Sequence, residues 1–302
     1  MFQLASRLAR STGGMSLLKR NCSSSTIPQY ETLAVTVHSP FVYHVELNRP
    51  DRLNAMNGTM WREVGEAFRV LADDKDCRVV VLSGAGRAFT AGLDLSDPSV
   101  LMPSVEDDDD IARRCQAMHR LIRRYQDSVT SLEKCLKPVI CAMNGPCVGA
   151  GVDIASTADI RLCSSDSWFQ IKEVAIGLAA DVGTLQRLPK AIGSRSLVNE
   201  LALTARKFLS AEAKECGFVS GVFPDKESLM KAAFEMAASI AAMSPVAVQM
   251  TKRSLVFSRD HTVDESLEHI ASWNQALLQS DDLMKSAMAA ATKSPPPTFS
   301  KL

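Results

Sequence analysis

Short apolar runs alternate with longer amphipathic stretches along this chain. Runs with the length and composition of strands occupy residues 33–37, 41–47, 78–83, 138–143 and 160–163. Those at 78–83 and 138–143 are largely apolar, which is typical of parallel strands buried on both faces. The chain therefore carries the strand pattern of a buried sheet.

Helical periodicity fills the intervals between these runs. It is clearest at 60–71 and 111–135, and from residue 194 onward the pattern is almost wholly helical, with weak strand character at 219–223. Strands that alternate with helices predict βαβ units and a mainly parallel sheet. We therefore expect an α/β fold followed by a separate helical region.

Composition and charge exclude several classes of function. Of the 302 residues 46% are hydrophobic, and 34 basic residues balance 34 acidic ones. This balance gives no bulk attraction to nucleic acid or to an anionic membrane. The eight cysteines form no CxxC pair, and no cluster of cysteines and histidines has zinc-ligand spacing. We expect reduced, mostly buried thiols, structural or surface histidines and no metal site.

The N-terminal segment has the composition of an organelle address. The first acidic residue is Glu31, and Arg7, Arg10, Lys19 and Arg20 precede it among many serines. Such a segment is typical of a mitochondrial transit peptide, although a disordered basic tail has a similar composition. It holds no long uncharged apolar run, so we expect neither a secretory signal nor a membrane span.

The C-terminus carries a second address, the peroxisomal tripeptide Ser300-Lys301-Leu302. The prolines at 295–297 cannot continue a helix, so the tripeptide should stay extended and exposed for its import receptor. The two ends together predict a protein of the mitochondrion and the peroxisome.

Two glycine-rich turns, at residues 83–94 and 144–153, each follow a buried strand, and a short helix is expected from Val152. Small residues let the backbone approach a ligand closely, and an N–H at a turn or helix start can donate to a developing oxyanion. Neither turn matches a nucleotide-binding motif. Their glycine content alone favours a plain tight turn over a ligand site.

Three acids follow these turns, Asp153, Glu173 and Asp181, and the last two lie in apolar stretches. A bare charge is costly there unless it is used or paired. For any one acid taken by itself a structural interpretation is preferred, because Asp153 and Asp181 could cap helices and Glu173 could pair with Lys172 or Arg187.

The ordered set of segments resembles the enoyl-CoA hydratase/isomerase (crotonase) superfamily over residues 33 to 285. The resemblance rests on 48–50 with 54–56, on 89–94, on 145–151 and on the three acids. Within the superfamily, the acids, the stretch 177–190, the segment 244–249 and the C-terminal tripeptide are similar to the branch that isomerises 3,5-dienoyl-CoA thioesters.

The resemblance implies a fold and a division of the chain. We expect a crotonase-like ββα spiral core at 30–225 and a helical oligomerisation region at 226–291. A disordered targeting segment at 1–29 and a tail at 292–302 would flank them. The family assembles as trimers, and two trimers would form a homo-hexamer.

The resemblance also implies a role for each site residue. The backbone N–H groups of Ala91 and Ala150 would form the oxyanion hole, with Ala150 standing where the family usually has glycine. Glu173 matches the family's catalytic glutamate, Asp153 stands where hydratases carry a second glutamate, and Asp181 matches an acid particular to the dienoyl branch. The substrate would contact Ala91, Gly92, Leu93, Asp94, Leu95, Ser96 and Ala150.

The expected reaction converts 3-trans,5-cis-dienoyl-CoA to 2-trans,4-trans-dienoyl-CoA in the β-oxidation of unsaturated fatty acids. Removal of a C2 proton places charge on the thioester oxygen, where two N–H donors stabilise it. C2 and C6 lie roughly 5 Å apart, so a base and a separate acid are needed. We assign Glu173 as base at C2, Asp181 as acid at C6 and Asp153 as a residue that tunes their protonation. Coenzyme A is part of the substrate, and no other cofactor is expected.

Three other functions remain open at this point. An enoyl-CoA hydratase would use two acids to add water, and a Δ3-Δ2-enoyl-CoA isomerase would need one carboxylate and no Asp181. A non-catalytic acyl-CoA-binding or RNA-binding member of the same fold is the third, because fold constrains function only loosely.

Overall fold

The computed structural model describes residues 27–103, 105–106 and 109–302. The predicted transit peptide lies almost wholly outside the described residues. Within them, the main sheet has six strands in the order β1-β2-β3-β4-β6-β9. Their bounds are β1 Leu33–Ser39, β2 Val42–Leu47, β3 Val79–Gly84, β4 Val139–Met143, β6 Ile160–Ser164 and β9 Gly221–Phe223.

The sheet is mainly parallel, as the sequence predicts. β1 pairs antiparallel with β2, and each of the other neighbouring strands pairs in parallel. Each predicted strand is present, and the α/β class is confirmed. The weak strand expected at 219–223 is confined to its last three residues, in β9.

The helices fill the intervals between strands and make up the C-terminal part of the chain. Side-chain oxygens of Asn57, Asp110, Ser194 and Asp225 accept a backbone N–H at four of their N-termini. The α-helix bounds are α1 Gly58–Asp73, α2 Ile111–Lys134, α3 Ala150–Thr157, α4 Thr184–Ala191, α5 Arg195–Thr204, α6 Ser210–Glu215, α7 Lys226–Ala241, α8 Pro245–Ser258, α9 Val263–Leu277 and α10 Asp281–Thr292. Short 3-10 helices span η1 Pro50–Arg52, η2 Pro98–Val100 and η3 Glu173–Ile176.

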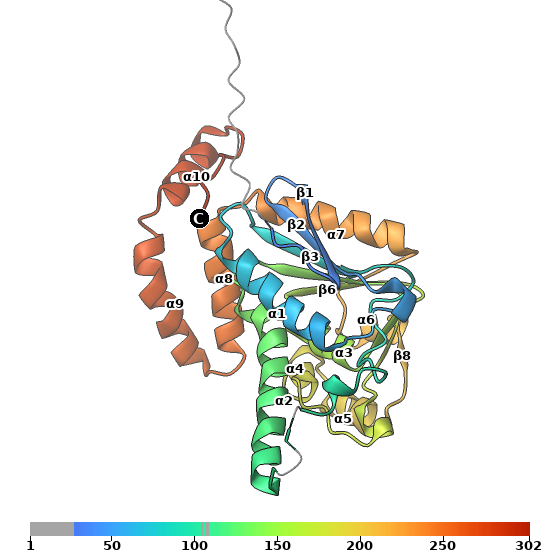
Figure 1. Ribbon diagram of the computed structural model, residues 1–302. Coiled ribbons are helices and arrows are strands. Elements are labelled where there is room, and N and C mark those ends of the chain that lie inside the picture. The colour runs from blue at the N-terminus through green and yellow to red at the C-terminus, as the bar shows by residue number, and fades with distance from the viewer. Residues whose placement is uncertain (1–26, 104, 107–108) are drawn as a thin grey trace, which may run out of the picture.

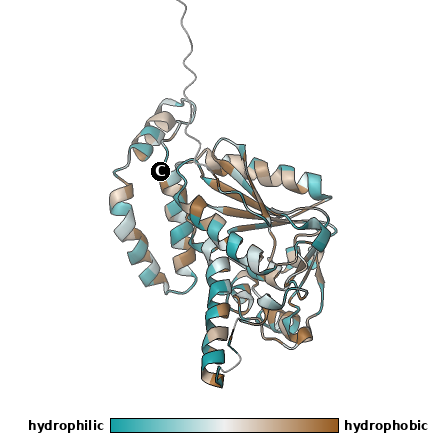
Figure 2. Cartoon of the chain, viewed as in Figure 1, coloured by the Kyte–Doolittle hydropathy of each residue, from teal (hydrophilic) through white to brown (hydrophobic). Residues whose placement is uncertain are grey.

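The main sheet is buried on both faces because side chains of β3 alternate between two apolar clusters. Val79 and Val81 pack with α7, whereas Val80 and Leu82 belong to a larger cluster with α1, α2 and α3. Figure 1 shows α7 along one face and α1 along the other, and Figure 2 shows hydrophobic strands between them. α7, the first helix of the region expected at 226–291, is therefore part of the core.

The remaining C-terminal helices, α8, α9 and α10, lie beside this body (Figure 1). The buried ammonium of Lys252 ties α8 to the core. It donates to the carbonyls of Leu132 at 3.1 Å and Lys137 at 3.0 Å and pairs with Asp159 at 2.8 Å. In the described part of the chain, no single helix combines the length and apolarity needed to cross a membrane. Taken together, α7 and α8 reach that length and apolarity, but the chain bends by 111° between them.

A second, small sheet was not predicted from the sequence. It contains β5 Pro146–Val148, β7 Trp168–Gln170 and β8 Phe208–Leu209, in that order. Strands of two or three residues are too short to show an alternating pattern. β5 pairs in parallel with β7, so this sheet fixes the second glycine-rich turn between the main sheet and α3.

The C-terminal tripeptide lies outside any helix or strand and its side chains are exposed, as expected, but its backbone is held by the core. The guanidinium of Arg78 donates to the carbonyl of Phe299 at 2.7 Å and to that of Ser300 at 3.2 Å. Lys301 forms an ion pair with Asp76. The seven described cysteines are free thiols and five of them are buried, which agrees with the expectation from their spacing.

Candidate active site

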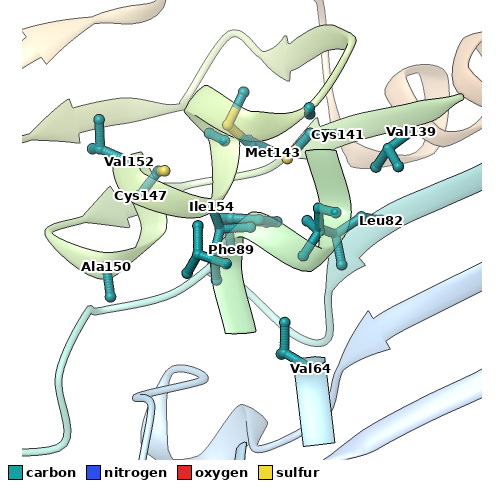
Figure 3. Packing of buried hydrophobic residues seen from close by; sticks show 14 of the residues in the cluster. Val64, Leu82, Phe89, Val139, Cys141, Met143, Cys147, Ala150, Val152 and Ile154 are labelled. Carbon is teal, nitrogen blue, oxygen red and sulfur yellow. The ribbon is translucent and has the colours of Figure 1, made fainter. Parts of the chain in front are cut away.

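The two glycine-rich turns meet because parallel strands β3 and β4 end at the same edge of the sheet. The N–H of Phe89 donates to the carbonyl of Asn144 at 2.7 Å. Thr90 then pairs with Cys147 in a parallel bridge, with hydrogen bonds of 3.1 Å on each side. Figure 3 shows Phe89, Cys147 and Ala150 in the packed core at this junction.

The first turn offers a different amide from the one expected. The N–H of Ala91 donates to the carbonyl of Leu53 at 2.9 Å, so it is not available to a ligand, and the prediction for Ala91 is wrong. The backbone of Met56 forms hydrogen bonds with the residues on either side of Leu93. Its N–H donates to the carbonyl of Gly92 at 2.8 Å, and its carbonyl accepts from the N–H of Asp94 at 3.1 Å. In such a parallel bridge the N–H of Leu93 itself points away from Met56, and it has no hydrogen-bond partner among the described residues.

The second turn offers the N–H of Ala150, which is the first residue of α3. The first N–H groups of a helix have no partner within it, and the helix dipole favours negative charge there. Helix α3 thus starts at Ala150 rather than at Val152. The two turns approach so closely that a Cβ on Gly92 would lie 2.9 Å from the carbonyl oxygen of Val148. Gly92 also has a φ of +90°, so glycine is needed there on both grounds.

A cavity of about 290 Å³ lies beside these amides. Leu93, Ala150, Asp153, Glu173 and Asp181 line one part of it, and the rest is apolar. The apolar lining comes mainly from Trp61, Val100, Leu101, Met118, Leu121, Ile122, Tyr125, Leu178, Ala179 and Val182. The structure therefore brings together the three acids that the sequence singled out, although they come from three different segments.

Glu173 opens η3 and has 9% of its surface exposed. Its Oε2 atom is buried and has no hydrogen-bond partner in the described part of the protein. The alternative partner Arg187 binds Glu133 instead, at 2.9 Å. Burial raises the pKa of Glu173 to about 7, and the neighbouring Asp153 carboxylate raises it further in the same direction. Glu173 is thus an unpaired carboxyl poised to exchange a proton near neutral pH.

Asp153 is buried in the first turns of α3 and does not cap this helix, whose N-cap is Gly149. Its Oδ1 accepts hydrogen bonds from the N–H of Thr184 at 2.6 Å and from the Thr184 hydroxyl at 2.7 Å. Burial raises the pKa of Asp153 to about 6, and the Thr184 hydrogen bonds oppose this rise. Through these hydrogen bonds Asp153 joins α3 to the first residue of α4. Its carboxylate also lies close enough to Glu173 to affect the pKa of that residue.

Asp181 lies in the loop between η3 and α4 and is the most exposed of the three acids. It does not cap α4, because Gly183 occupies that position. Its carbonyl accepts a hydrogen bond of 2.6 Å from the side chain of Gln126 on α2. Burial raises the pKa of Asp181 as well. Sequence reasoning missed Gln126, because a glutamine in a polar helix carries no signal of such a contact.

The other expected substrate contacts divide into two groups. Leu93 lines the cavity, whereas the carboxylate of Asp94 braces the turn through Arg49 at 2.9 Å and the Ser96 hydroxyl at 2.5 Å. The hydrogen bond from Ser96, followed by that from Arg49, lowers the pKa of Asp94. Leu95 and Ser96 are exposed beyond this point. The turn is thus a braced strip that runs from the cavity to the surface.

The histidines named below make contacts away from the cavity of the three acids. His44 bonds the Ser83 hydroxyl at 2.8 Å, His38 stacks on Phe234, and His261 stacks on Phe257. Across the described ranges, no group of three His, Cys, Asp or Glu side chains is placed to hold a metal ion.

Comparison with known proteins gives a consistent family. The model of the family described as enoyl-CoA hydratase/isomerase matches residues 39–300. A mitochondrial Δ(3,5)-Δ(2,4)-dienoyl-CoA isomerase of Rattus norvegicus is 54% identical over 277 residues, which cover 90% of this chain and 84% of that protein. A peroxisomal protein of the same name from Arabidopsis thaliana is 40% identical over 279 residues, covering 92% of this chain and 100% of that protein.

Solved structures resemble the chain over most of its length. An enoyl-CoA hydratase from Bacillus anthracis superposes with a TM-score of 0.80 at 25% identity and covers 89% of this chain and 99% of its own. An enoyl-CoA hydratase subunit from Geobacillus kaustophilus gives a TM-score of 0.78 at 27% identity, covering 89% and 98% of the two chains.

The buried carboxyl of Glu173 makes stability depend on pH. Its folded pKa is raised above the ordinary value, so the wild type loses stability as pH rises from about 4.5 through about 7, where the buried group must ionise. We expect Glu173→Gln to unfold at higher urea than wild type at pH 8, with a gain of about 2–3 kcal/mol that falls below about 1 kcal/mol at pH 5. Glu235→Gln, which removes an exposed carboxylate, is the matched control. Parallel pH profiles for wild type and both variants would contradict the burial argument.

Proposed function

The chain belongs to the enoyl-CoA hydratase/isomerase family, and from that premise we propose that it isomerises 3-trans,5-cis-dienoyl-CoA to 2-trans,4-trans-dienoyl-CoA. It acts as an isomerase on fatty acyl-CoA thioesters in β-oxidation. The observation that carries this function is a single apolar cavity in which Asp181 joins Glu173 beside two amide donors. Relatives with the dienoyl isomerase name, at half or more identical residues, support it.

The thioester oxygen would accept hydrogen bonds from the N–H groups of Leu93 and Ala150. Both residues line the cavity, and the Ala150 donor stands at the positive end of α3. When the C2 proton leaves, negative charge moves to this oxygen, and donors fixed in advance stabilise it without reorganisation. The pantetheine arm of coenzyme A would then leave the cavity along the braced strip 93–96.

Proton transfer would need two carboxyl groups at two carbons. Glu173, whose pKa lies near neutrality, takes the C2 proton in its ionised form. The remaining charge delocalises over the diene to C6, where the protonated Asp181 donates. Asp153 disfavours ionisation of Glu173 by its own charge, so the three acids share protons and titrate together. We propose that this chemistry needs no metal or redox cofactor.

The hydratase alternative fits the site less well. A hydratase of this family would need the acid at position 153 to hold a water over the substrate. Here one oxygen of Asp153 accepts two hydrogen bonds from Thr184, while Asp181 adds an acid that hydration does not require. A Δ3-Δ2-enoyl-CoA isomerase needs one carboxylate, so Asp181 would have no role in that reaction. Assays with 2-enoyl-CoA and 3-enoyl-CoA separate these activities.

The protein is assigned to the mitochondrion and the peroxisome, since its relatives are named for one organelle or the other. The two terminal addresses fit both destinations. We propose that the exposed Ser300-Lys301-Leu302 engages an import receptor for peroxisomal delivery.

Asp181 is the residue that distinguishes the proposed reaction. We expect Asp181→Asn to lower kcat for 3,5-octadienoyl-CoA by about 10²–10⁴-fold, because C6 then lacks its proton donor. Appearance of the conjugated 2,4-diene in the ultraviolet gives the rate, and binding of octanoyl-CoA should persist. Asp73→Asn, at the exposed end of α1, is the control. Equal rates for Asp181→Asn and wild type would remove the reason for preferring this reaction.

Oligomerisation is a separate proposal, supported by the family resemblance and by apolar side chains on α8, α9 and α10. Leu255, Leu267, Met284 and Met288 are each 60–67% exposed in the single chain. Large apolar side chains left exposed on several helices of one region are typical of an interface. We propose a hexamer built as a dimer of trimers.

Light scattering tests the assembly. We expect a mass of about six chains for wild type, and a smaller assembly for Leu255→Asp, since a charge on α8 would have to be buried without a partner. A wild-type mass of one chain at micromolar concentration would contradict the proposal.

A further inference from the structure

A second cavity of about 480 Å³ lies behind the apolar end of the acyl cavity, between α1, α2 and the loop around residue 102. The two cavities share Trp61, Leu121 and Tyr125 as lining residues. These three side chains therefore form the partition between them. Asp153, Glu173 and Asp181 line the first cavity, Asp181 also borders a polar cavity between α2 and α4, and none of the three acids lines the second cavity.

The partition is built around a stacked aromatic pair. The rings of Trp61 and Tyr125 lie 4.5 Å apart between centroids with an interplanar angle of 25°. Trp61 is 2% exposed, and its carbonyl accepts a hydrogen bond from the Ser128 hydroxyl, which ties α1 to α2 at this level. Tyr125 is only half-buried. Trp61 is thus the fixed part of the partition, and Tyr125 is the part that a ligand can displace or a substitution can remove.

The direction of the substrate follows from the positions of the acids. C2 must lie at Glu173 beside the Leu93 and Ala150 amides, and C6 must lie at Asp181. Carbons beyond C6 then extend into the apolar part of the same cavity, which Met118, Ile122 and the aromatic pair line. A longer chain that crosses the partition would enter the second cavity, because the two cavities share these lining residues.

From this arrangement we propose that the Trp61–Tyr125 stack is the end wall of the acyl cavity and sets the acyl-chain length that the protein accepts. The proposal rests on the proposed function, in that it takes the cavity of Glu173 and Asp181 to be the acyl site. Chains that end before the wall fit without rearrangement. Chains that must pass it have to displace Tyr125, and each methylene that stays in water loses the stabilisation that burial supplies.

The second cavity has the character of a site for the end of an acyl chain. Met102, Pro103 and Leu121 supply apolar lining next to the wall, while Arg62, Arg69 and Arg124 stand at the surface side with their charges. A methyl end would meet the apolar part first and leave the arginines solvated. Opening the wall should therefore let longer chains enter this space.

The wall is tested by the dependence of kcat/KM on chain length. Wild type and Tyr125→Ala are compared on 3,5-dienoyl-CoA substrates of eight to sixteen carbons. We expect kcat/KM of wild type to fall once the chain reaches the wall, and Tyr125→Ala to raise the ratio of sixteen-carbon to eight-carbon kcat/KM by about tenfold or more. Tyr125→Phe keeps the ring and should keep the ratio. Arg120→Ala, on the same helix but in neither cavity lining, is the control for α2.

A second variant and a second measurement complete the test. Leu121→Ala thins the same partition, so it should move the ratio in the same direction even if Tyr125→Ala fails to fold. Unchanged ratios in folded Tyr125→Ala and Leu121→Ala would overturn the proposal. Calorimetric titration with octanoyl-CoA and hexadecanoyl-CoA measures the length preference without turnover. A wild type that prefers octanoyl-CoA, with variants that lose the preference, would support the wall even if no dienoyl-CoA were isomerised. That last result would overturn the proposed reaction alone.

Discussion

The site depends on the meeting of two turns at the carboxyl edge of the main sheet. β3 and β4 are parallel neighbours, so the chain leaves both at the same edge, and the Thr90–Cys147 bridge then holds the two turns together. This pairing places the N–H groups of Leu93 and Ala150 beside one cavity. Glycine at position 92 is required because the turns approach within a distance that a Cβ would block. Without this contact the two N–H groups would not lie together beside the acids, and the proposed thioester carbonyl could not bind there.

Removing carboxyl groups from water around the cavity has an electrostatic cost, which is largest for the buried Asp153 and Glu173 and smaller for the exposed Asp181. Each of the three has a raised pKa, and burial is the first cause in every case. Asp153 receives two hydrogen bonds in return, from the N–H and the hydroxyl of Thr184. Glu173 keeps an unsatisfied oxygen, which makes it a better base and a poorer structural residue. A fold that must bury the ionised Glu173 carboxylate above neutral pH is therefore less stable than one with an amide at that position.

Helix α2 contributes to the site at two successive residues. Gln126 holds the Asp181 carbonyl, and Tyr125 closes the far end of the acyl cavity. The placement of the second acid and the length of the cavity thus depend on one packed helix, which the stacking of Tyr125 on Trp61 joins to α1. Changes in the packing of α1 against α2 should therefore alter both the catalytic rate and the preferred length of the acyl chain.

The sequence alone determined the α/β class, the strands of the main sheet and the three acids. Apolar runs and helical periodicity are local properties. Glu173 and Asp181 were marked by charges in apolar stretches, and all three acids follow an ordered set of family motifs. The tertiary structure decided what depends on distant partners. Which amide of the first turn faces the cavity is fixed by Leu53 and Met56, so the sequence pointed to Ala91 where the free donor is Leu93. Strands β5, β7 and β8 are too short to have a period of their own. Trp61, Tyr125 and Gln126 are ordinary helix residues until α1, α2 and the Asp181 loop are packed together, because their roles come from contacts across the fold and not from their neighbours in the chain.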